Sequence, residues 1–248
     1  MFKKIYLSIL LCCAGLNAQV AIVNGASFRG DQPVAPGSWV AAFGTFSGVS
    51  TTTAATFPLP KLLGGVRVTL GGVDAALYDV RSTQITFLVP YAVAAGLQPV
   101  QITTGSATIS GSVRVISSAP GLFIKDTAVP PKGAVRNQDG VTENSASAPA
   151  RRGDIVSLYG TGPGALSRNP EDGAAPGATP TIATTKSTPQ VFVGGVEAQV
   201  QFSGLNPDAP GLWQINVVVP NQSFLTGRVP VQVFMDGVDS NEVTIFVQ

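Results

Sequence analysis

The sequence predicts an all-β fold of two tandem antiparallel immunoglobulin-like β-sandwiches, and three observations lead to this prediction. Short runs rich in β-branched and aromatic residues recur about every ten to twelve residues, with turn residues between them. No stretch after residue 18 keeps the 3.6-residue period of an amphipathic helix. The runs of the first half return in the same order in the second half. We therefore predict sandwiches over residues 19–118 and 119–248, nearly free of helix.

The first 18 residues have the three parts of a secretory signal peptide. Lys3 and Lys4 supply the positive start, and residues 5–16 form an apolar run that is too short to span a bilayer comfortably. Ala18 supplies the small residue that precedes a cleavage site. This pattern predicts a signal peptide at residues 1–18 and export to the periplasm, the cell surface or the medium.

Cleavage removes both cysteines and two of the 15 basic residues. A lipoprotein anchored at Cys12 or Cys13 is the alternative, which is disfavoured because neither is preceded by a small residue. The mature chain has no thiol for a disulfide or a metal site. Its 13 basic residues (15 minus 2) and 14 acidic residues give a net charge of −1. We therefore expect no nucleic-acid partner, and the lack of a second long apolar run predicts no transmembrane span in the mature chain.

The candidate strands of the first half follow one another with turn residues between them. Gly71 and Gly72 predict a tight hairpin turn, after which the chain returns through residues 75–80. Trp39 and Phe43 share one face of their run. The apolar runs are residues 20–23, 38–44, 66–70, 75–80, 84–90, 99–104 and 111–116.

The run at residues 84–90 is the centre around which we expect each half to be built. Ile85, Phe87 and Val89 alternate with the residues between them, so these three side chains should face a core. Four blocks of the first half have counterparts in the second, and the offset differs between blocks because loops tolerate insertions. We therefore predict a duplicated domain. The matched blocks are 37–45 with 153–161, 68–73 with 191–196, 84–90 with 214–220, and 99–102 with 230–233.

An ordered series of short motifs over nearly all of the mature chain resembles the Solibacter-type C-terminal domain of acidobacterial secreted proteins. The halves of that family are similar to TIG/IPT immunoglobulin-like modules. The resemblance implies an exported module with no established activity and no catalytic residues to carry over. This chain departs from the family at Pro163, where the family has leucine, and its signal leads straight into the module. The motifs include Asn24-Gly25-Ala26-Ser27-Phe28, Ala35-Pro36-Gly37, Gln84-Ile85, Ala119-Pro120-Gly121-Leu122-Phe123, Asn137-Gln138-Asp139-Gly140, Gln214-Ile215-Asn216 and Ser240-Asn241.

The sequence is poor in residues for catalysis. It contains no histidine, which excludes a Ser-His-Asp triad, a histidine general base and a histidine-ligated zinc. A carboxylate pair, as in glycosidases, or a Ser-Lys pair is what an enzyme could still use. Asp139, Asp172 and Asp236 each precede a glycine, as turn residues do. Residues 137–144 and 236–241 are rich in oxygen side chains but lack calcium-loop spacing. We predict no enzyme, no catalytic residue, no cofactor and no metal.

The preferred function is a non-catalytic module that binds an extracellular protein or gives structural support. The candidate binding residues are in the loop of the second half before its central strand, together with an aromatic residue of the first half. An edge strand that accepts a partner strand is a second possible surface. A carbohydrate-binding module that uses Trp213 or Tyr91 is the alternative function, and a carboxylate-based hydrolase ranks last. Trp39 and Tyr159 are expected in the cores. The candidate binding residues are Leu205, Asn206, Asp208, Trp213 and Tyr91.

Overall fold

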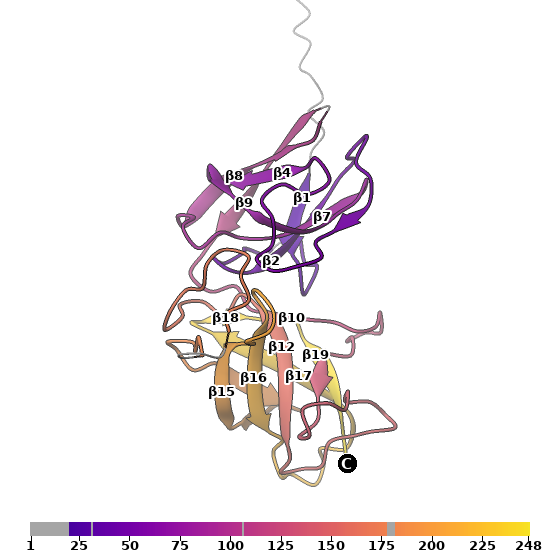
Figure 1. Cartoon of the computed structure of the whole chain (residues 1–248). Helices are drawn as coiled ribbons and strands as arrows, with labels where there is room; N and C mark the ends of the chain where they lie inside the picture. Colours follow the sequence, from indigo (N-terminus) through magenta and orange to yellow (C-terminus); the bar gives the residue numbers. More distant parts are fainter. Residues whose placement is uncertain (1–19, 31, 106, 178–181) are drawn as a thin grey trace, which may run out of the picture.

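The computed structural model describes residues 20–30, 32–105, 107–177 and 182–248. The predicted signal peptide, with the alternative anchor at Cys12 or Cys13, lies outside these residues. The regular secondary structure of the described chain is entirely β-strand, and within it no helix is long and apolar enough to cross a membrane. The strands build two sandwiches, one above the other (Figure 1). The predicted fold class, two tandem antiparallel immunoglobulin-like β-sandwiches, is thereby confirmed.

The first sandwich packs two antiparallel sheets face to face. Their strand orders are β1-β2-β7-β6-β3 and β5-β4-β8-β9. Leaving out the short β3, these are the ABED and C′CFG sheets of the immunoglobulin fold. The bounds are β1 (Ala21–Asn24), β2 (Trp39–Phe43), β3 (Thr52–Thr53), β4 (Arg67–Leu70), β5 (Val73–Asp74), β6 (Ala76–Val80), β7 (Gln84–Leu88), β8 (Gly96–Thr103) and β9 (Thr108–Val115).

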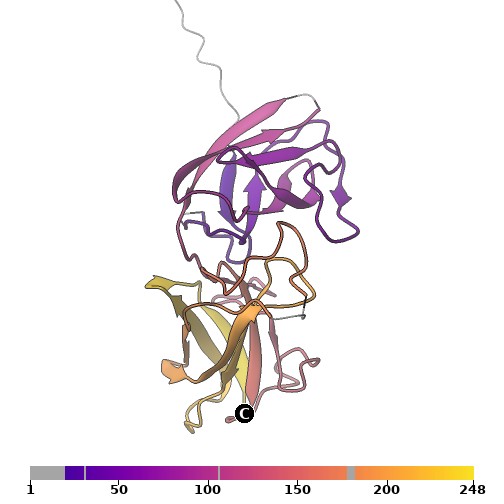
Figure 2. The same ribbon diagram turned by 60° about the vertical axis from the view of Figure 1, so that its left-hand side comes forward.

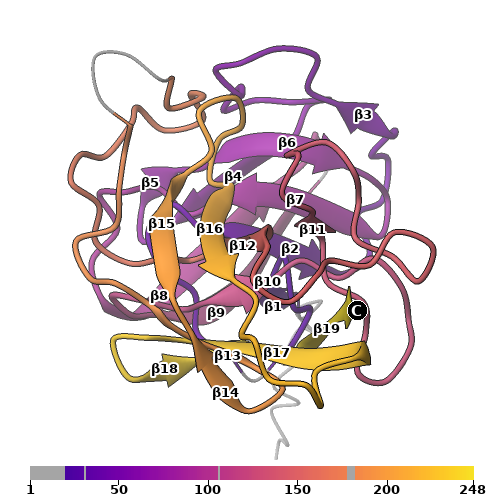
Figure 3. The ribbon, with the colours of Figure 1, turned by 90° about the horizontal axis from the view of Figure 1, so that it is seen from below.

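The second sandwich repeats this arrangement. One sheet has the order β10-β12-β16-β15 with β11 beside β12, and the other has β14-β13-β17-β18 with β19 beside β17. Figure 3 shows the two sheets from below. The bounds are β10 (Gly121–Leu122), β11 (Val135–Arg136), β12 (Ile155–Thr161), β13 (Gln190–Val193), β14 (Val196–Ala198), β15 (Val200–Leu205), β16 (Trp213–Val218), β17 (Gly227–Met235), β18 (Val238–Asp239) and β19 (Val243–Val247).

The duplication extends to the pairing register of the central strands. Ile85 of β7 lies opposite Ala42, and Ile215 of β16 lies opposite Leu158, which are equivalent pairs in the two copies. Both copies also carry a β-bulge at the same place. The register shifts between Leu77 and Asp79 in β6 and between Val200 and Phe202 in β15. Because a bulge reorients the strand that carries it, the two halves share a detail of backbone path and not only a pattern of hydrophobicity.

The alternation read from the sequence gives the inward face of β7 correctly. Ile85, Phe87 and Val89 are fully buried in the core of the first sandwich. In β2 the inward residues are Val40 and Ala42. Trp39 and Phe43 do share a face, as predicted, but it is the outer face, so the expectation that Trp39 lies in a core is wrong.

The hairpin predicted at Gly71 and Gly72 is present. Both glycines have positive φ, 58° and 81°, and join β4 to β5, as a two-residue hairpin turn of this kind requires. The returning segment differs from the prediction. Only β5 pairs with β4, whereas β6 crosses to the other sheet and pairs with β7. A period of two tells which residues share a face but not which sheet a strand joins.

The two sandwiches are joined by direct contacts as well as by the chain between them. Two loops of the second sandwich reach up to the first (Figure 2). The Trp39 indole N–H donates to the carbonyl of Pro210 at 3.0 Å, and the Trp39 backbone N–H donates to the Thr161 hydroxyl at 2.8 Å. The Leu59 backbone N–H donates to the carbonyl of Gly173 at 2.8 Å. Backbone and side chain therefore both fix one sandwich on the other.

Candidate functional site

Trp213 and Leu205, two of the five predicted binding residues, are buried. Trp213 is 0% exposed and is the largest fully buried side chain of the described residues. Its indole N–H donates to the Ser203 hydroxyl at 3.0 Å. Leu205 packs with Leu166 and Ala183 under the neighbouring loop. The expectation that Trp213 is exposed at a loop end is wrong, and neither residue lies where a partner could touch it without unfolding.

The burial of Trp213 follows from the period of its strand. Ile215, Val217 and Val219 face the core of the second sandwich, and one step of two towards the N-terminus reaches Trp213. The strand therefore begins one residue earlier than the repeated phrase suggested. The signal was present in the sequence, but the proline-rich residues before Trp213 favoured a loop.

Tyr91, the third predicted residue, lies between the two sandwiches. It packs against the cluster of Leu166, Ala183 and Leu205. Its backbone N–H donates to the Asp172 carboxylate at 3.0 Å. Burial, with a further contribution from the negative charge of Asp172, raises the pKa of the Tyr91 hydroxyl above its ordinary value of 10.0. Tyr91 is thus part of the contact between the sandwiches and not an exposed sugar-stacking platform.

The raised pKa of Tyr91 predicts an alkaline loss of stability. Near pH 10 only the unfolded chain ionises this hydroxyl, so unfolding releases a proton and the free energy of unfolding falls as the pH rises. Below the unfolded pKa of about 10 the stabilisation is fully present. We expect Tyr91→Phe to remove part of the alkaline loss, which is measured as the difference between wild type and variant in urea unfolding from about pH 8 to about pH 11. Parallel pH profiles of the two proteins would contradict the assignment.

The remaining two predicted residues, Asn206 and Asp208, line an open pocket of about 570 Å³ on the second sandwich. Asn206 Oδ1 accepts from the Asp208 backbone N–H at 3.0 Å, and the Asn206 backbone N–H donates to the carbonyl of Leu212 at 2.7 Å. These bonds close the loop that precedes β16. The other lining residues are Phe123, Lys125, Ala134, Val135, Arg136, Val141, Glu143, Tyr159 and Leu212.

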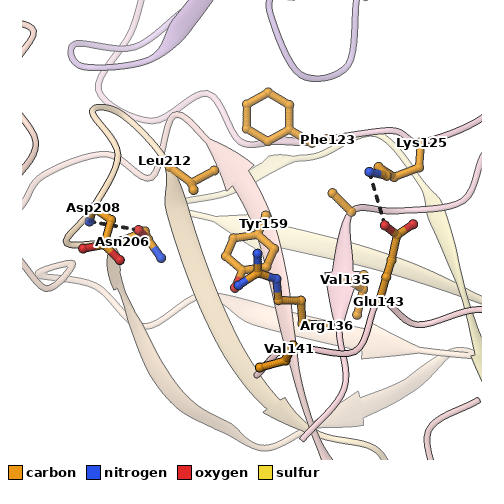
Figure 4. A pocket seen from close by; sticks show the side chains of 11 residues that line it. Phe123, Lys125, Val135, Arg136, Val141, Glu143, Tyr159, Asn206, Asp208 and Leu212 are labelled. Atoms are coloured by element: carbon orange, nitrogen blue, oxygen red, sulfur yellow. Dashed lines mark hydrogen bonds and ion pairs between the residues drawn. The ribbon is translucent and has the colours of Figure 1, made fainter. Parts of the chain in front are cut away.

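The floor of this pocket is formed by Tyr159 of β12 and Arg136 of β11. The Arg136 guanidinium lies over the Tyr159 ring, 5.7 Å from the ring centroid, a cation–π distance. Figure 4 shows this pair between Asn206 and Asp208 on one side and the Lys125–Glu143 pair on the other. Tyr159 lies on the outer face of its sheet, so the expectation that it is a core residue is wrong. In the sequence, only its alternation with the apolar residue Leu158 indicated this.

Charges of both signs surround the floor. Lys132 Nζ and Lys125 Nζ lie 2.6 Å and 3.3 Å from the Glu143 carboxylate. The hydrogen bond from Lys132, followed by that from Lys125, lowers the pKa of Glu143. Arg136 Nη1 donates to the carbonyl of Gly140 at 3.1 Å, and no carboxylate pairs with it among the described residues. Arg136 is therefore a charged group of this pocket that a ligand carboxylate could approach.

The loop that carries Asn206 and Asp208 is held from behind by the first sandwich. Gly211 of this loop approaches the first sandwich so closely that a Cβ would lie 2.8 Å from the carbonyl oxygen of Gly37. The φ of Gly211 is 61°, which favours glycine. The contact between the sandwiches therefore fixes the position of this pocket wall. Because the loop is already held in place, a ligand would lose less free energy to ordering it on binding.

The acidic turns considered as calcium loops have protein partners. The Asp139 carboxylate accepts from the backbone N–H groups of Val141 and Thr142, and the Ser118 hydroxyl donates to Asp236 at 2.8 Å. Asn241 bonds the backbone N–H and the carbonyl of Leu122. The described residues contain no cluster of three or more potential metal-ligating side chains.

Comparison with solved structures finds proteins that are similar to this chain at low sequence identity. A mixed-linkage glucan utilization locus protein of Bacteroides ovatus, SGBP-B, solved with a mixed-linkage heptasaccharide, is 13% identical with a TM-score of 0.35 and covers 87% of this chain and 42% of its own. A tandem of titin immunoglobulin domains is 8% identical with a TM-score of 0.24, and the match covers 88% of this chain and 95% of the titin chain. The plexin A4 extracellular region is 13% identical with a TM-score of 0.30, and the match covers 92% of this chain and 18% of the plexin chain.

This chain therefore spans less than half of the Bacteroides protein and less than a fifth of the plexin. No protein-family model and no curated protein matches the sequence. The resemblance to the Solibacter-type domain family stays a prediction. Because the three TM-scores are low, the immunoglobulin-like architecture of this chain is assigned from its own strand order.

Proposed function

We propose that this chain is an exported, non-catalytic module that binds a partner protein through the pocket around Arg136 and Tyr159. The observation that carries the proposal is an open pocket of about 570 Å³ with apolar walls and an arginine that no carboxylate of the described residues neutralises. Arginine, tyrosine and tryptophan side chains are the residues on which protein interfaces most depend.

A protein partner fits this pocket better than a glycan. A sugar needs a free aromatic face for stacking, and the Arg136 guanidinium covers the Tyr159 ring. Val141, at the rim, is 80% exposed, and an apolar rim side chain of this kind suits an apolar group of a partner. Phe123 and Leu212 extend the apolar wall. The partner would bring an apolar side chain into the pocket and a carboxylate to Arg136.

The absence of catalysis is supported by the residues that line the pocket. The chain has no histidine, and its two cysteines are within the predicted signal peptide. Glycosidases need one carboxylic acid whose pKa is raised so that it can donate a proton. Glu143, a carboxylate of this pocket, has its pKa lowered by Lys132 and Lys125, so it is a poor general acid. Export is supported by the signal-peptide pattern of residues 1–18.

The proposal is tested by charge reversal at the pocket floor. Arg136→Glu should reduce the recovery of a cross-linked partner from envelope extracts by roughly tenfold or more, because the ligand carboxylate would meet a like charge. Quantitative mass spectrometry of the captured proteins measures this. Val141→Asp should also reduce the recovery of the partner, because it places a charge on the apolar rim of the pocket. Its melting temperature should change little, because the Val141 side chain is exposed.

Arg151→Glu is the matched control. It makes the same charge change on the same sandwich at an exposed residue outside the pocket. Equal capture by wild type, Arg136→Glu and Val141→Asp would reject the pocket as the binding site. If the wild type bound specific glycans on an array and both variants lost this binding, the partner would be a carbohydrate and not a protein. Exchanging the whole loop for a glycine linker is unsuitable, since its end includes the buried Trp213.

A further inference from the structure

The outer edge of β19 in the second sandwich is covered by the chain itself. The Thr244 backbone N–H donates to the carbonyl of Pro131, and its carbonyl accepts from the Gly133 N–H at 3.0 Å. The Phe246 backbone N–H donates to the Asn144 side chain at 2.6 Å, and its carbonyl accepts from the Ala150 N–H at 2.9 Å. The backbone groups that face away from β17 at these residues are therefore paired.

The equivalent edge in the first sandwich is that of β9. Val113 lies opposite Gln98 as Ile245 lies opposite Val229, so Ser112 and Arg114 are the counterparts of Thr244 and Phe246. At one end the two copies agree. Val34 pairs in parallel with Val115, as Ala150 does with Val247. The covering residues 131–144 have no counterpart, because 14 residues separate β1 from β2 whereas 32 separate β10 from β12.

The backbone of Ser112 faces outward, and its partner on β8 shows why. Pro99, opposite Ser112, has no N–H, and its carbonyl accepts from Gly71 on the far side of β8. In an antiparallel pair, alternate residues direct both backbone groups away from the neighbour. Val34 meets the outward carbonyl of Arg114 at 2.9 Å. Within the described part of the chain, the Ser112 backbone and the Arg114 N–H have no hydrogen-bond partner.

Before Arg114, the open edge carries none of the usual devices that prevent pairing with another strand. Natural sheets block their free edges with charged side chains, prolines or β-bulges. Residues 108–113 contain none of these three features. The side chains of Ser110 and Ser112 are exposed. A pocket of about 200 Å³ beside the edge is lined in part by Ile22, Leu97 and Arg114.

We propose that β9 accepts an extended strand of a second, different polypeptide, paired in parallel over residues 110–114. The second sandwich supplies the template, since residues 131–133 already make the parallel bonds to Thr244 that the incoming strand would make to Ser112. Arg114 is exposed and forms no ion pair within the described residues. The incoming strand therefore carries a carboxylate opposite Arg114 and an apolar side chain beside Leu97. This surface is separate from the pocket around Arg136.

The test uses the mature protein and a synthetic peptide with the sequence of residues 128–137. In the template, Lys132 lies opposite Thr244, so residue 134 of the peptide would lie opposite Arg114. The peptide therefore carries Ala134→Glu. In a nuclear magnetic resonance titration at millimolar peptide, the amide signals of Ser112 and Arg114 should shift, and their hydrogen exchange should slow. N-methylation of Gly133 in the peptide removes one bond and should weaken binding roughly tenfold.

Protein variants complete the test. Ser112→Pro removes the outward N–H at a position where an edge strand tolerates proline, and it should abolish the shifts, whereas Ser112→Thr should retain them. The wild-type protein should bind the Ala134→Glu peptide more tightly than the peptide that keeps Ala134. The Arg114→Gln protein should bind the two peptides equally. Three outcomes would overturn the proposal: no shift at Ser112 and Arg114, equal binding of the N-methylated peptide, or sedimentation showing that β9 instead pairs with a second copy of the chain. The N-methylated peptide decides the matter even if Ser112→Pro fails to fold.

Discussion

Trp213→Ala is expected to lower the free energy of unfolding by about 3–5 kcal/mol, the range found when large aromatic side chains are removed from cores. The indole fills the second sandwich beside Ile215. Its N–H also pairs with the Ser203 hydroxyl, to which Thr185 donates at 2.8 Å. The substitution leaves a cavity and removes one partner of the half-buried Ser203 hydroxyl. Urea unfolding followed by circular dichroism measures the loss.

Two variants separate packing from hydrogen bonding at this position. Trp213→Phe keeps most of the apolar contact and loses the N–H, so it should cost about 1–3 kcal/mol. Phe224→Ala removes an aromatic ring that is 64% exposed on the same sandwich, and it should change stability by no more than about 0.5 kcal/mol. A loss below about 1 kcal/mol for Trp213→Ala would show that Trp213 is not a core residue.

Trp39→Ala is expected to uncouple the two sandwiches. The indole donates to Pro210 across the contact, and its ring packs with Leu59 and Leu88 and meets Tyr78 edge-on at 5.5 Å. Its removal should cost about 3 kcal/mol in total, divided between packing inside the first sandwich and the bond to Pro210 that joins the sandwiches. In calorimetry we expect one unfolding transition to become two, because each sandwich has its own core.

Leu62→Ala is the control for Trp39→Ala, since it removes an exposed apolar side chain of the first sandwich that lies near Leu59 in sequence. It should leave a single transition. Two transitions in the wild type would contradict the coupling, as would a single unchanged transition in Trp39→Ala. Trp39→Phe, which keeps a ring but no N–H, should lie between alanine and wild type. Loss of coupling should also weaken the pocket, because the loop of Asn206 loses its support at Pro210.

The sequence predicted only part of the candidate site. Asn206 and Asp208 line the pocket, as loop residues of a turn-rich segment commonly do. Tyr91 and Trp213 flank the central strands, a position that predicts exposure, yet Tyr91 packs between the sandwiches and Trp213 packs within a core. Nothing in the sequence marks Arg136 as a site residue, because its neighbours across the sheet depend on strand pairing. Its position over Tyr159 depends on β11 pairing with β12.

Local sequence was sufficient to establish the class of fold, the duplication and the inward faces of the central strands. Side-chain period and turn chemistry are local properties, and Ile85 and Ile215 occupy equivalent places as their phrases predicted. Which outward faces stay exposed could be seen only in the folded chain. Trp39 and Tyr159 occupy similar outer faces, but Trp39 packs with Leu59 and Leu88 and bonds to Pro210 of the other sandwich, whereas the Arg136 guanidinium lies over the Tyr159 ring. That difference depends on contacts between residues far apart in the chain, and no local pattern encodes their distance.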